Sequence, residues 1–491
     1  MAKSPNSALV SNSALVIVVS CCAALLAGCQ SAWIVRDPEY AAVIDRFSQA
    51  TSQFDPPAEA LAPPSEELAG PHSVEHYIAF ARAQNPDIQA ARKQAEAAAN
   101  RVPQAASLPD PMIGVTTFPE SVQTAAGQQE VLLTASQKLP WMGKLNARAE
   151  LAEKNTQVAR ARLAAVELGV IEQVKRAYYE LYFVDQALLI TQADRELLLR
   201  LTKILESRLK TGKVSQRDVL RAQLEVSNRD AELIRLRQQL QSAQARLARR
   251  LHVSPDTPLR ALKRLPPGHV PEDLEQLYHQ AVAARPELHA ELAAIERDRQ
   301  AVHLARLDYY PDVTLGFTWI DTSSSGISPV ANGRDPLLLG LSMNLPIYRS
   351  RLDAGVREAE ARSVASARRY DSLRDQTLEE VKDLFARATS QQALLQLFTE
   401  DIIPKADQTL RVSRRAYEVG TVDFFQLIDD WRKLFKFQLM QKQLEAQLRQ
   451  TLASLERVVG GTPSPEPAEM VPPAEDLSPP EALPPAGRLR P

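Results

Sequence analysis

The chain has 491 residues, in which 58 lysines and arginines nearly balance 60 aspartates and glutamates, for a net charge of −2. So small a net charge gives no electrostatic reason to expect nucleic acid as a partner. Glycine is scarce at 17 residues and aromatic residues make up only 5%, a composition typical of long helices. All the cysteines precede residue 30, which excludes disulfide scaffolds and thiolate zinc sites from the rest of the chain.

The first 28 residues have the pattern of an export signal. Lys3 precedes an apolar run from Ala14 to Leu26, which is too short to span a bilayer. The run ends in Leu-Ala-Gly and Cys29, which resembles the bacterial lipobox, where the cysteine becomes the acylated first residue of the mature chain. Gln30 follows in place of the aspartate that retains many lipoproteins at the inner membrane, so the resemblance implies lipid anchoring at the outer membrane. The alternative is an ordinary secretory peptide or a short anchor in which Cys29 is incidental.

The chain beyond the signal contains two copies of one unit. Asn85–Ile88 recurs as Arg285–Leu288, and Lys210–Gly212 recurs as Glu418–Gly420, with an offset that drifts only from 200 to 208. Ordered landmarks at a nearly constant offset indicate an internal duplication. We therefore predict a signal peptide, a proline-rich lead, two repeats and a disordered proline-rich tail, over residues 1–28, 29–71, 72–256, 257–461 and 462–491.

Proline spacing predicts the helices. No proline occurs between Pro140 and Pro255, so a helix can run over 144–210, break at Gly212 and resume over 216–252. The other predicted helices cover about 73–106, 273–308, 351–417 with a kink at Pro404, and 422–459. Helices this long cannot enclose a globular core, so we expect them to pack side by side in a tall bundle or coiled-coil cylinder.

Segments between the helices alternate apolar and polar residues with a period of two, which predicts strands. They are Ile113–Thr117, which is followed by a loop, then Val131–Lys138, Asp312–Trp319 and Leu337–Leu345. A strand that crosses a bilayer needs about nine to eleven residues. Aromatic residues flank the segments, where a membrane interface would place them: Phe118, Trp141, Tyr309, Tyr310, Trp319 and Tyr348.

Four strands cannot close a barrel, and open strand edges are not tolerated in lipid. Membrane insertion would therefore require oligomerisation, and three chains would supply twelve strands, within the range of outer-membrane barrels. The alternative is a small soluble sheet that caps a helical bundle.

These features together resemble the TolC family of outer-membrane efflux proteins over about residues 72–461. The most specific segment is Arg415–Asp430, similar to the family's tyrosine- and glycine-bearing turn before an acid-bearing helix start, and Arg208–Leu220 is its counterpart in the first repeat. The resemblance implies a fold that is mainly α with a small β part. It implies a homotrimer whose twelve-stranded transmembrane β-barrel, four strands per chain, continues as a long α-helical coiled-coil tunnel across the periplasm.

The function implied is that of the outer-membrane channel in a tripartite efflux system. Such a channel passively conducts substrates that an inner-membrane pump and a periplasmic adaptor, or membrane fusion, protein deliver to it. Gln137–Leu145 is similar to the strand-to-helix junction of TolC-like proteins that accompany heavy-metal pumps of the resistance-nodulation-division type. A pump of this type is therefore expected, with heavy-metal cations or drugs as the exported substrates.

The resemblance also places a periplasmic gate near the start of the last helix. Asp429 matches one gate position of the family, whereas the other position, three residues earlier, is Gln426 in this chain. Asp423 and Asp430 are the candidates to supply the missing charge.

An acidic ring at a tunnel mouth has a clear electrostatic effect. Three carboxylates around a threefold axis repel one another, raise one another's pKa and attract cations. The closed mouth would then be held by other contacts, for which Arg217 and Arg221 are candidates. The alternative is that Asp429 and Asp430 only complement the positive end of the helix dipole or face solvent.

Two glycine-centred turns are expected at the periplasmic tip, at Gly212 with Lys213 and at Gly420 with Thr421. A helix that reverses within a few residues needs a left-handed position, which glycine adopts without a Cβ clash. In the TolC family these turns contact the hairpins of the adaptor, so the same contact is implied here.

No motif for catalysis or nucleotide binding is present: the sequence lacks a Walker loop, G-x-G-x-x-G, G-x-S-x-G and H-E-x-x-H. We therefore expect neither an enzyme nor a cofactor. His72 and His76 are four residues apart but have no third ligand nearby, so no metal site is expected. The rival interpretation is a lipid-anchored periplasmic coiled-coil scaffold or adaptor, which does not account for a duplicated unit with aromatic-ended strands.

Overall fold

The structure is a computed structural model that describes residues 40, 66–212, 214–266, 268–324 and 333–461. Cys29, the export signal, Lys213 and the proline-rich tail lie outside the described residues. All the elements below belong to the compact unit that begins at Pro64.

The helices of the first repeat are α3 (Val74–Gln84), α4 (Pro86–Ala99), α5 (Arg101–Ala106), α6 (Lys144–Lys210) and α7 (Gln216–Leu251). The predictions for α6 and α7 are confirmed within one residue. The prediction of one helix over 73–106 is wrong, because the chain forms three shorter helices there. Asn85 separates the first two: its side chain accepts hydrogen bonds from the amides of Asp87 and Ile88, and Pro86 has no amide to continue α3.

The second repeat follows the same plan. Its helices are α8 (Leu274–Ala284), α9 (Pro286–Leu307), α10 (Arg349–Leu397), α11 (Ile403–Glu418) and α12 (Phe424–Val459). A π-helical turn over Phe398–Ile402 separates α10 from α11 directly before Pro404. The predicted kink is therefore confirmed, and its cause is a proline that cannot donate to the helical ladder.

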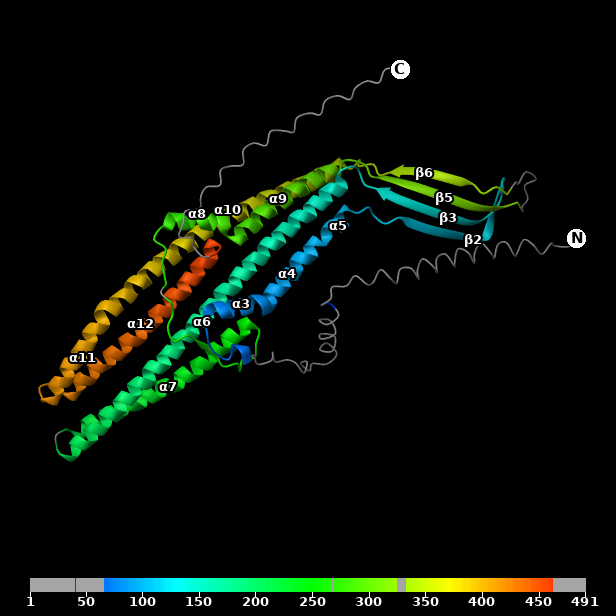
Figure 1. Cartoon of the computed structure of the whole chain (residues 1–491). Helices are drawn as coiled ribbons and strands as arrows, with labels where there is room; N and C mark the ends of the chain where they lie inside the picture. The colour runs from blue at the N-terminus through cyan, green and yellow to red at the C-terminus, as the bar shows by residue number, and fades with distance from the viewer. Residues whose placement is uncertain (1–39, 41–65, 213, 267, 325–332, 462–491) are drawn as a thin grey trace, which may run out of the picture. The chain divides into compact units, whose positions relative to one another are not determined.

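Four of the strands form an antiparallel sheet, in the order β2 (Met112–Thr124), β3 (Gly127–Leu139), β5 (Val313–Ser323) and β6 (Leu337–Met343) (Figure 1). The prediction of a loop after Thr117 is wrong, because β2 continues through a register shift between Thr117 and Val122. The two repeats meet in the middle of the sheet, where β3 pairs with β5 and Leu133 lies opposite Trp319.

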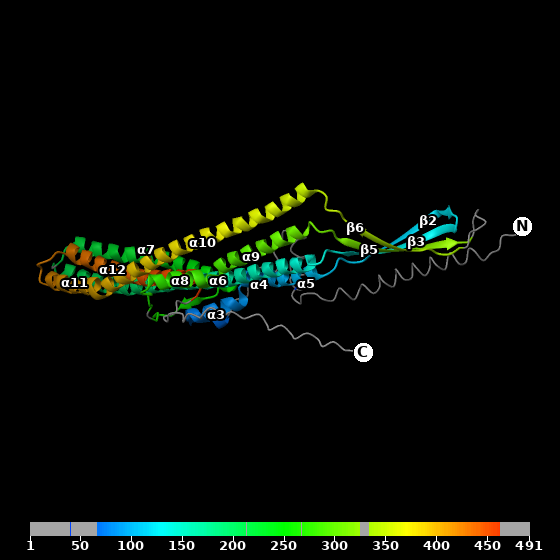
Figure 2. The ribbon, with the colours of Figure 1, turned by 90° about the horizontal axis from the view of Figure 1, so that it is seen from above.

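The long helices lie side by side, with α6 against α4, α7, α9 and α12 (Figure 2). At about 1.5 Å per residue, the 67 residues of α6 extend for about 100 Å, from the sheet to the turn that leads into α7. Buried apolar clusters hold the helices together at intervals rather than as one globular core. Among the described residues, no helix is both long and apolar enough to cross a membrane.

A short parallel pair of strands, β1 (Gly70–His72) and β4 (Leu259–Ala261), lies against one face of α6. The hydroxyl of Tyr178 donates to the carbonyl of His72 at 3.1 Å and accepts from the amide of Leu262 at 3.1 Å. Tyr77 of α3 packs on Tyr178 with 5.9 Å between ring centroids. The lead into the first repeat and the linker between the repeats therefore cover the same face of α6.

Candidate functional site

The turns at the ends of the two helical hairpins have the predicted left-handed glycines. Gly212 has φ +71° and Gly420 has φ +78°, and a Cβ at either position would meet no atom within 4 Å. The amide of Thr421 donates to the carbonyl of Ala416 at 2.9 Å, which closes the end of α11. Glycine is therefore required by the backbone conformation rather than by packing, and adaptor contact at these turns stays a prediction.

Three of the four gate candidates are engaged at the start of α12. Asp423 is the N-cap of this helix, and its Oδ1 accepts from the amide of Gln426 at 2.9 Å. Asp430 is buried and accepts hydrogen bonds from Ser413 Oγ at 2.5 Å and from Gln426 Nε2 at 3.1 Å. Because Ser413 belongs to α11, the Asp430 carboxylate joins α11 to α12 and does not share the exposed face of its neighbour.

Asp429 is the gate candidate whose carboxylate is partly exposed and pairs, among the described residues, only within its own helix. Its side chain is 38% exposed and pairs with Lys433 of the next helical turn at 2.7 Å. In the single chain the Arg221 guanidinium lies over the ring of Phe425 at 5.3 Å, and its contact at the closed mouth of an assembled trimer stays a prediction. No hydrogen bond or ion pair within the described residues joins Arg217 to Asp429.

A buried polar network lies one helical turn beyond Asp429. Asp194 of α6 accepts from Arg229 Nε of α7 at 2.7 Å and from Trp431 Nε1 of α12 at 2.6 Å. The Arg229 guanidinium lies 4.0 Å from the ring centroid of Phe435. These contacts fix α12 against the first hairpin, and sequence reasoning missed them. The available signal was an acidic residue within the apolar stripe of α6 that includes Leu198.

A second buried polar cluster joins the sheet to the helices. Lys144, at the start of α6, is 3% exposed, and its Nζ lies 2.8 Å from Asp312 Oδ1 and 3.1 Å from the carbonyl of Tyr310. The amide of Trp141 also donates to Asp312 at 3.1 Å. The structure thus brings the junction segment Gln137–Leu145 to the residues directly before β5, about 170 residues later in the sequence.

These contacts perturb the Asp312 carboxyl. Burial alone would raise its pKa, but the hydrogen bond from Lys144 and the one from the Trp141 amide outweigh burial. Lys138, 3.2 Å from Oδ2, acts in the same direction, and the pKa of Asp312 falls from 3.8 to about 2. The cluster is therefore an ion pair at neutral pH that joins the strand-to-helix junction of the first repeat to the helix-to-strand junction of the second.

The histidine pair is a ring stack. His72 and His76 lie 4.7 Å apart between centroids, with nearly parallel planes. Across the described parts of the chain, no three His, Cys, Asp or Glu side chains are grouped so that they could hold a metal ion.

Comparison with known proteins identifies a matching protein family. The model of the family described as "Outer membrane efflux protein" matches residues 78–251 and 277–461, one segment in each repeat. The chain is 24% identical over 421 residues to the cobalt-zinc-cadmium resistance protein CzcC of Cupriavidus metallidurans, an alignment that covers 84% of this chain and 95% of that protein.

Solved structures share the fold. The outer membrane protein VceC from Vibrio cholerae aligns with a TM-score of 0.65 and 21% identity, over 80% of this chain and 97% of VceC. CusC, whose structures concern folding and transmembrane channel formation, aligns with a TM-score of 0.68 and 19% identity, over 80% of this chain and 93% of CusC. The mainly helical architecture with a small sheet is therefore confirmed.

Proposed function

Because the chain belongs to the outer membrane efflux protein family, we propose that three copies of it assemble into the outer-membrane duct of a tripartite efflux system. Proteins of this family are channels rather than enzymes, and the chain is an outer-membrane channel component of efflux. This membership also removes the adaptor or scaffold interpretation.

The proposal of a trimer is supported by the two open edges of the four-stranded sheet. In the described chain β2 and β6 each pair on one side only. Both carry exposed apolar side chains, among them Ile113 at 73% and Leu339 at 82%. A row of unpaired backbone groups is costly in lipid, so β2 of one copy would pair with β6 of the next. Three copies would together form a closed barrel of twelve strands.

The remaining assignments rest on the sequence resemblances. The turn that follows α6 and the turn that follows α11 lie away from the sheet (Figure 1), and Gly212, Lys213, Gly420 and Thr421 would meet the adaptor. The inner-membrane pump would be of the resistance-nodulation-division type. Cys29 would carry the acyl chains that anchor the chain in the outer membrane. We also propose repeats over 72–256 and 257–461, within which both family-matched segments lie.

Asp429 would form the periplasmic gate with its two symmetry mates. It is the acidic residue in the first two turns of α12 that remains partly exposed, with Asp423 used as a cap and Asp430 buried. A ring of three such carboxylates would attract cations to the mouth.

Heavy-metal cations are the cargo that the comparisons favour. The relative CzcC is named for cobalt, zinc and cadmium resistance and aligns over nearly its whole length. The junction segment Gln137–Leu145, which resembles that of heavy-metal efflux channels, is held by the buried Lys144. Drug export is the alternative, and growth of a deletion strain on cobalt, zinc or cadmium compared with drugs would separate the two.

Disulfide cross-linking across the proposed seam tests the trimer. All native cysteines precede residue 30, so Ile113→Cys can be combined in one chain with cysteine at Leu337, Leu339 or Leu341. We expect at least one register to give covalent trimers under oxidation, because facing strand residues lie within disulfide reach. The matched control is Leu133→Cys with Trp319→Cys, which already face each other within one chain and should give a monomer. Monomers in every register, together with no heat-modifiable oligomer, would refute the trimer.

A further inference from the structure

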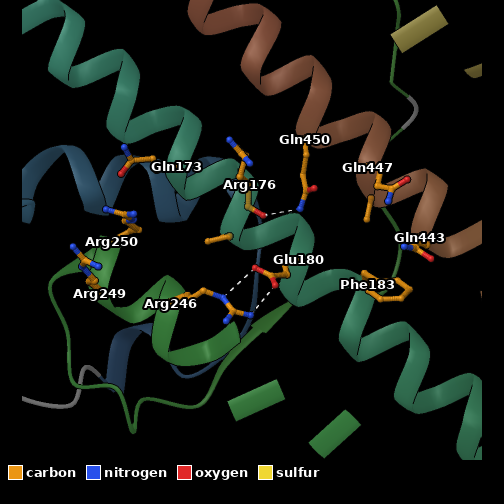
Figure 3. A pocket seen from close by; sticks show the side chains of 12 residues that line it. Gln173, Arg176, Glu180, Phe183, Arg246, Arg249, Arg250, Gln443, Gln447 and Gln450 are labelled. Atoms are coloured by element: carbon orange, nitrogen blue, oxygen red, sulfur yellow. Dashed lines mark hydrogen bonds and ion pairs between the residues drawn. The ribbon is translucent and has the colours of Figure 1, made fainter. Parts of the chain in front are cut away.

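A polar groove of about 660 Å³ lies over α6, between α7 and α12 (Figure 3). Three of the twelve residues that line it are apolar, and the others are arginines, glutamines and one glutamate. Its volume falls within the range of small-molecule sites, but its lining does not suit an apolar ligand. The lining is formed by Gln173, Arg176, Ala177, Glu180, Phe183, Arg246, Arg249, Arg250, Gln443, Ala446, Gln447 and Gln450.

The groove has an excess of positive charge. It contains four arginines and a single acidic residue, Glu180. Both oxygens of Glu180 accept from Arg246, at 2.7 and 3.1 Å, so this pair is neutralised. Arg176 lies 3.5 Å from Glu172, outside the groove. Among the described residues, the side chains of Arg249 and Arg250 have no hydrogen bond and no ion pair.

The duplication shows that this imbalance is not a requirement of the fold. At the offset of 208, Arg249 at the end of α7 corresponds to Arg457 at the end of α12. Arg457 lies 2.8 Å from Glu172 and 3.1 Å from Glu287. Glu172 of the first repeat and Glu287 of the second therefore neutralise this arginine, whereas its equivalent Arg249 has no carboxylate partner among the described residues.

The groove lies on the face of α6 opposite the one that β1 and the inter-repeat linker cover. Arg176 and Glu180 are each two residues from Tyr178, and two residues correspond to a rotation of about 200° in an α-helix. On α12, Arg449 lies with Gly268 of the linker, whereas Gln443, Ala446, Gln447 and Gln450 line the groove.

This opposite face is the lumenal one in the proposed trimer. Three copies of the layer formed by β1, β4 and the inter-repeat linker would obstruct the lumen of the proposed trimer, so this layer is assigned to the outside of the tunnel. The face that carries β1 is then external, and the groove faces the lumen. Gln447 is 18 residues beyond Asp429 on α12, about 27 Å further from the mouth.

We propose that this groove is an anion-binding site in the wall of the duct, where Arg249 and Arg250, with Arg176, bind a carboxylate or phosphate group of the transported molecule. The proposal rests on the proposed function for its lumenal position. Guanidinium groups form charge-assisted and often bidentate hydrogen bonds with both anions. The four glutamine amides can donate further hydrogen bonds, and none of them adds negative charge. A bare divalent cation would be repelled at this level, so a metal would be bound here only within an anionic complex.

The test compares the wild-type protein with the double variant Arg249→Gln and Arg250→Gln, using citrate and inorganic phosphate as separate probes. Binding to the full-length protein in detergent is measured by calorimetry at low ionic strength, because screening weakens exposed charges. Loss of two charge-assisted contacts should weaken binding at least about tenfold. Arg237→Gln is the matched control, since it removes an exposed arginine of α7 that does not line the groove.

Single-channel recordings give the second readout. We expect the double variant to lower the anion-to-cation permeability ratio and to weaken block by whichever probe binds, with Arg237→Gln unchanged. The probe that binds more tightly distinguishes a carboxylate from a phosphate cargo. If neither probe binds the wild-type protein, or if the double variant binds both as tightly as the wild type, the anion site is refuted. If the wild-type protein binds a probe but forms no channels in the single-channel recordings, the proposed duct is refuted instead.

Discussion

Replacing Asp312 with asparagine should weaken the junction between sheet and helices by an amount that depends on pH. The carboxyl has a pKa of about 2 in the folded protein against an ordinary value of 3.8. At about 1.36 kcal/mol per pH unit, this difference corresponds to about 2 kcal/mol of stability at neutral pH. Because Lys144 would also remain buried without its strongest partner, the loss in Asp312→Asn should be at least this large.

The pH dependence follows from the sign of the shift. A carboxyl whose pKa is lowered by folding stabilises the folded state above its unfolded pKa. That contribution decreases as the pH falls through about 4 and is lost near pH 2. The two proteins should therefore differ at pH 7 and converge toward pH 2.

Urea unfolding in detergent, followed by tryptophan fluorescence, measures the effect, because Trp141 stacks on Tyr310 with 5.1 Å between ring centroids at this junction. Asp308→Asn is the matched control: its side chain is 56% exposed and lies 3.6 Å from Lys144, so a loss below about 1 kcal/mol is expected. Equal midpoints for Asp312→Asn and wild type at pH 7, or a difference that persists at pH 2, would refute the reasoning.

Four further predictions concern the helix ends, the gate and the anchor. His252 is the left-handed C-cap of α7, with φ +58°. Its replacement by glycine should raise the free energy of unfolding by about 1 kcal/mol, measured by the same urea unfolding. Gly420→Val should reduce export while the heat-modifiable oligomer persists; normal export would argue against a strained turn. Asp429→Ala should weaken block by multivalent cations in single-channel recordings, whereas Asp371→Ala, on α10, should not. Cys29→Ser should abolish labelling by a fatty-acid analogue, and unchanged labelling would exclude the lipobox.

The sequence by itself determined the long helices, the strands and the duplication, because these are local patterns. The proline-free stretch between Pro140 and Pro255, interrupted at Gly212, specified α6 and α7, and Pro404 specified the break between α10 and α11. The signal at Asn85 was also local, since an Asn-Pro pair caps one helix and ends another. The family resemblance rested on such patterns and on one turn motif.

Only the tertiary structure decided which polar residues meet. Lys144 and Asp312 lie far apart in the sequence, as do Asp194 and Trp431, so no local period could pair them. Asp429 and Asp430 are neighbours with similar helix positions, yet packing against α11 buries only the second. Arg457 is neutralised by partners on other helices, whereas the side chain of its repeat equivalent Arg249 has no such partner among the described residues. A side chain's environment depends on the helices packed around it, which the sequence of its own helix does not encode.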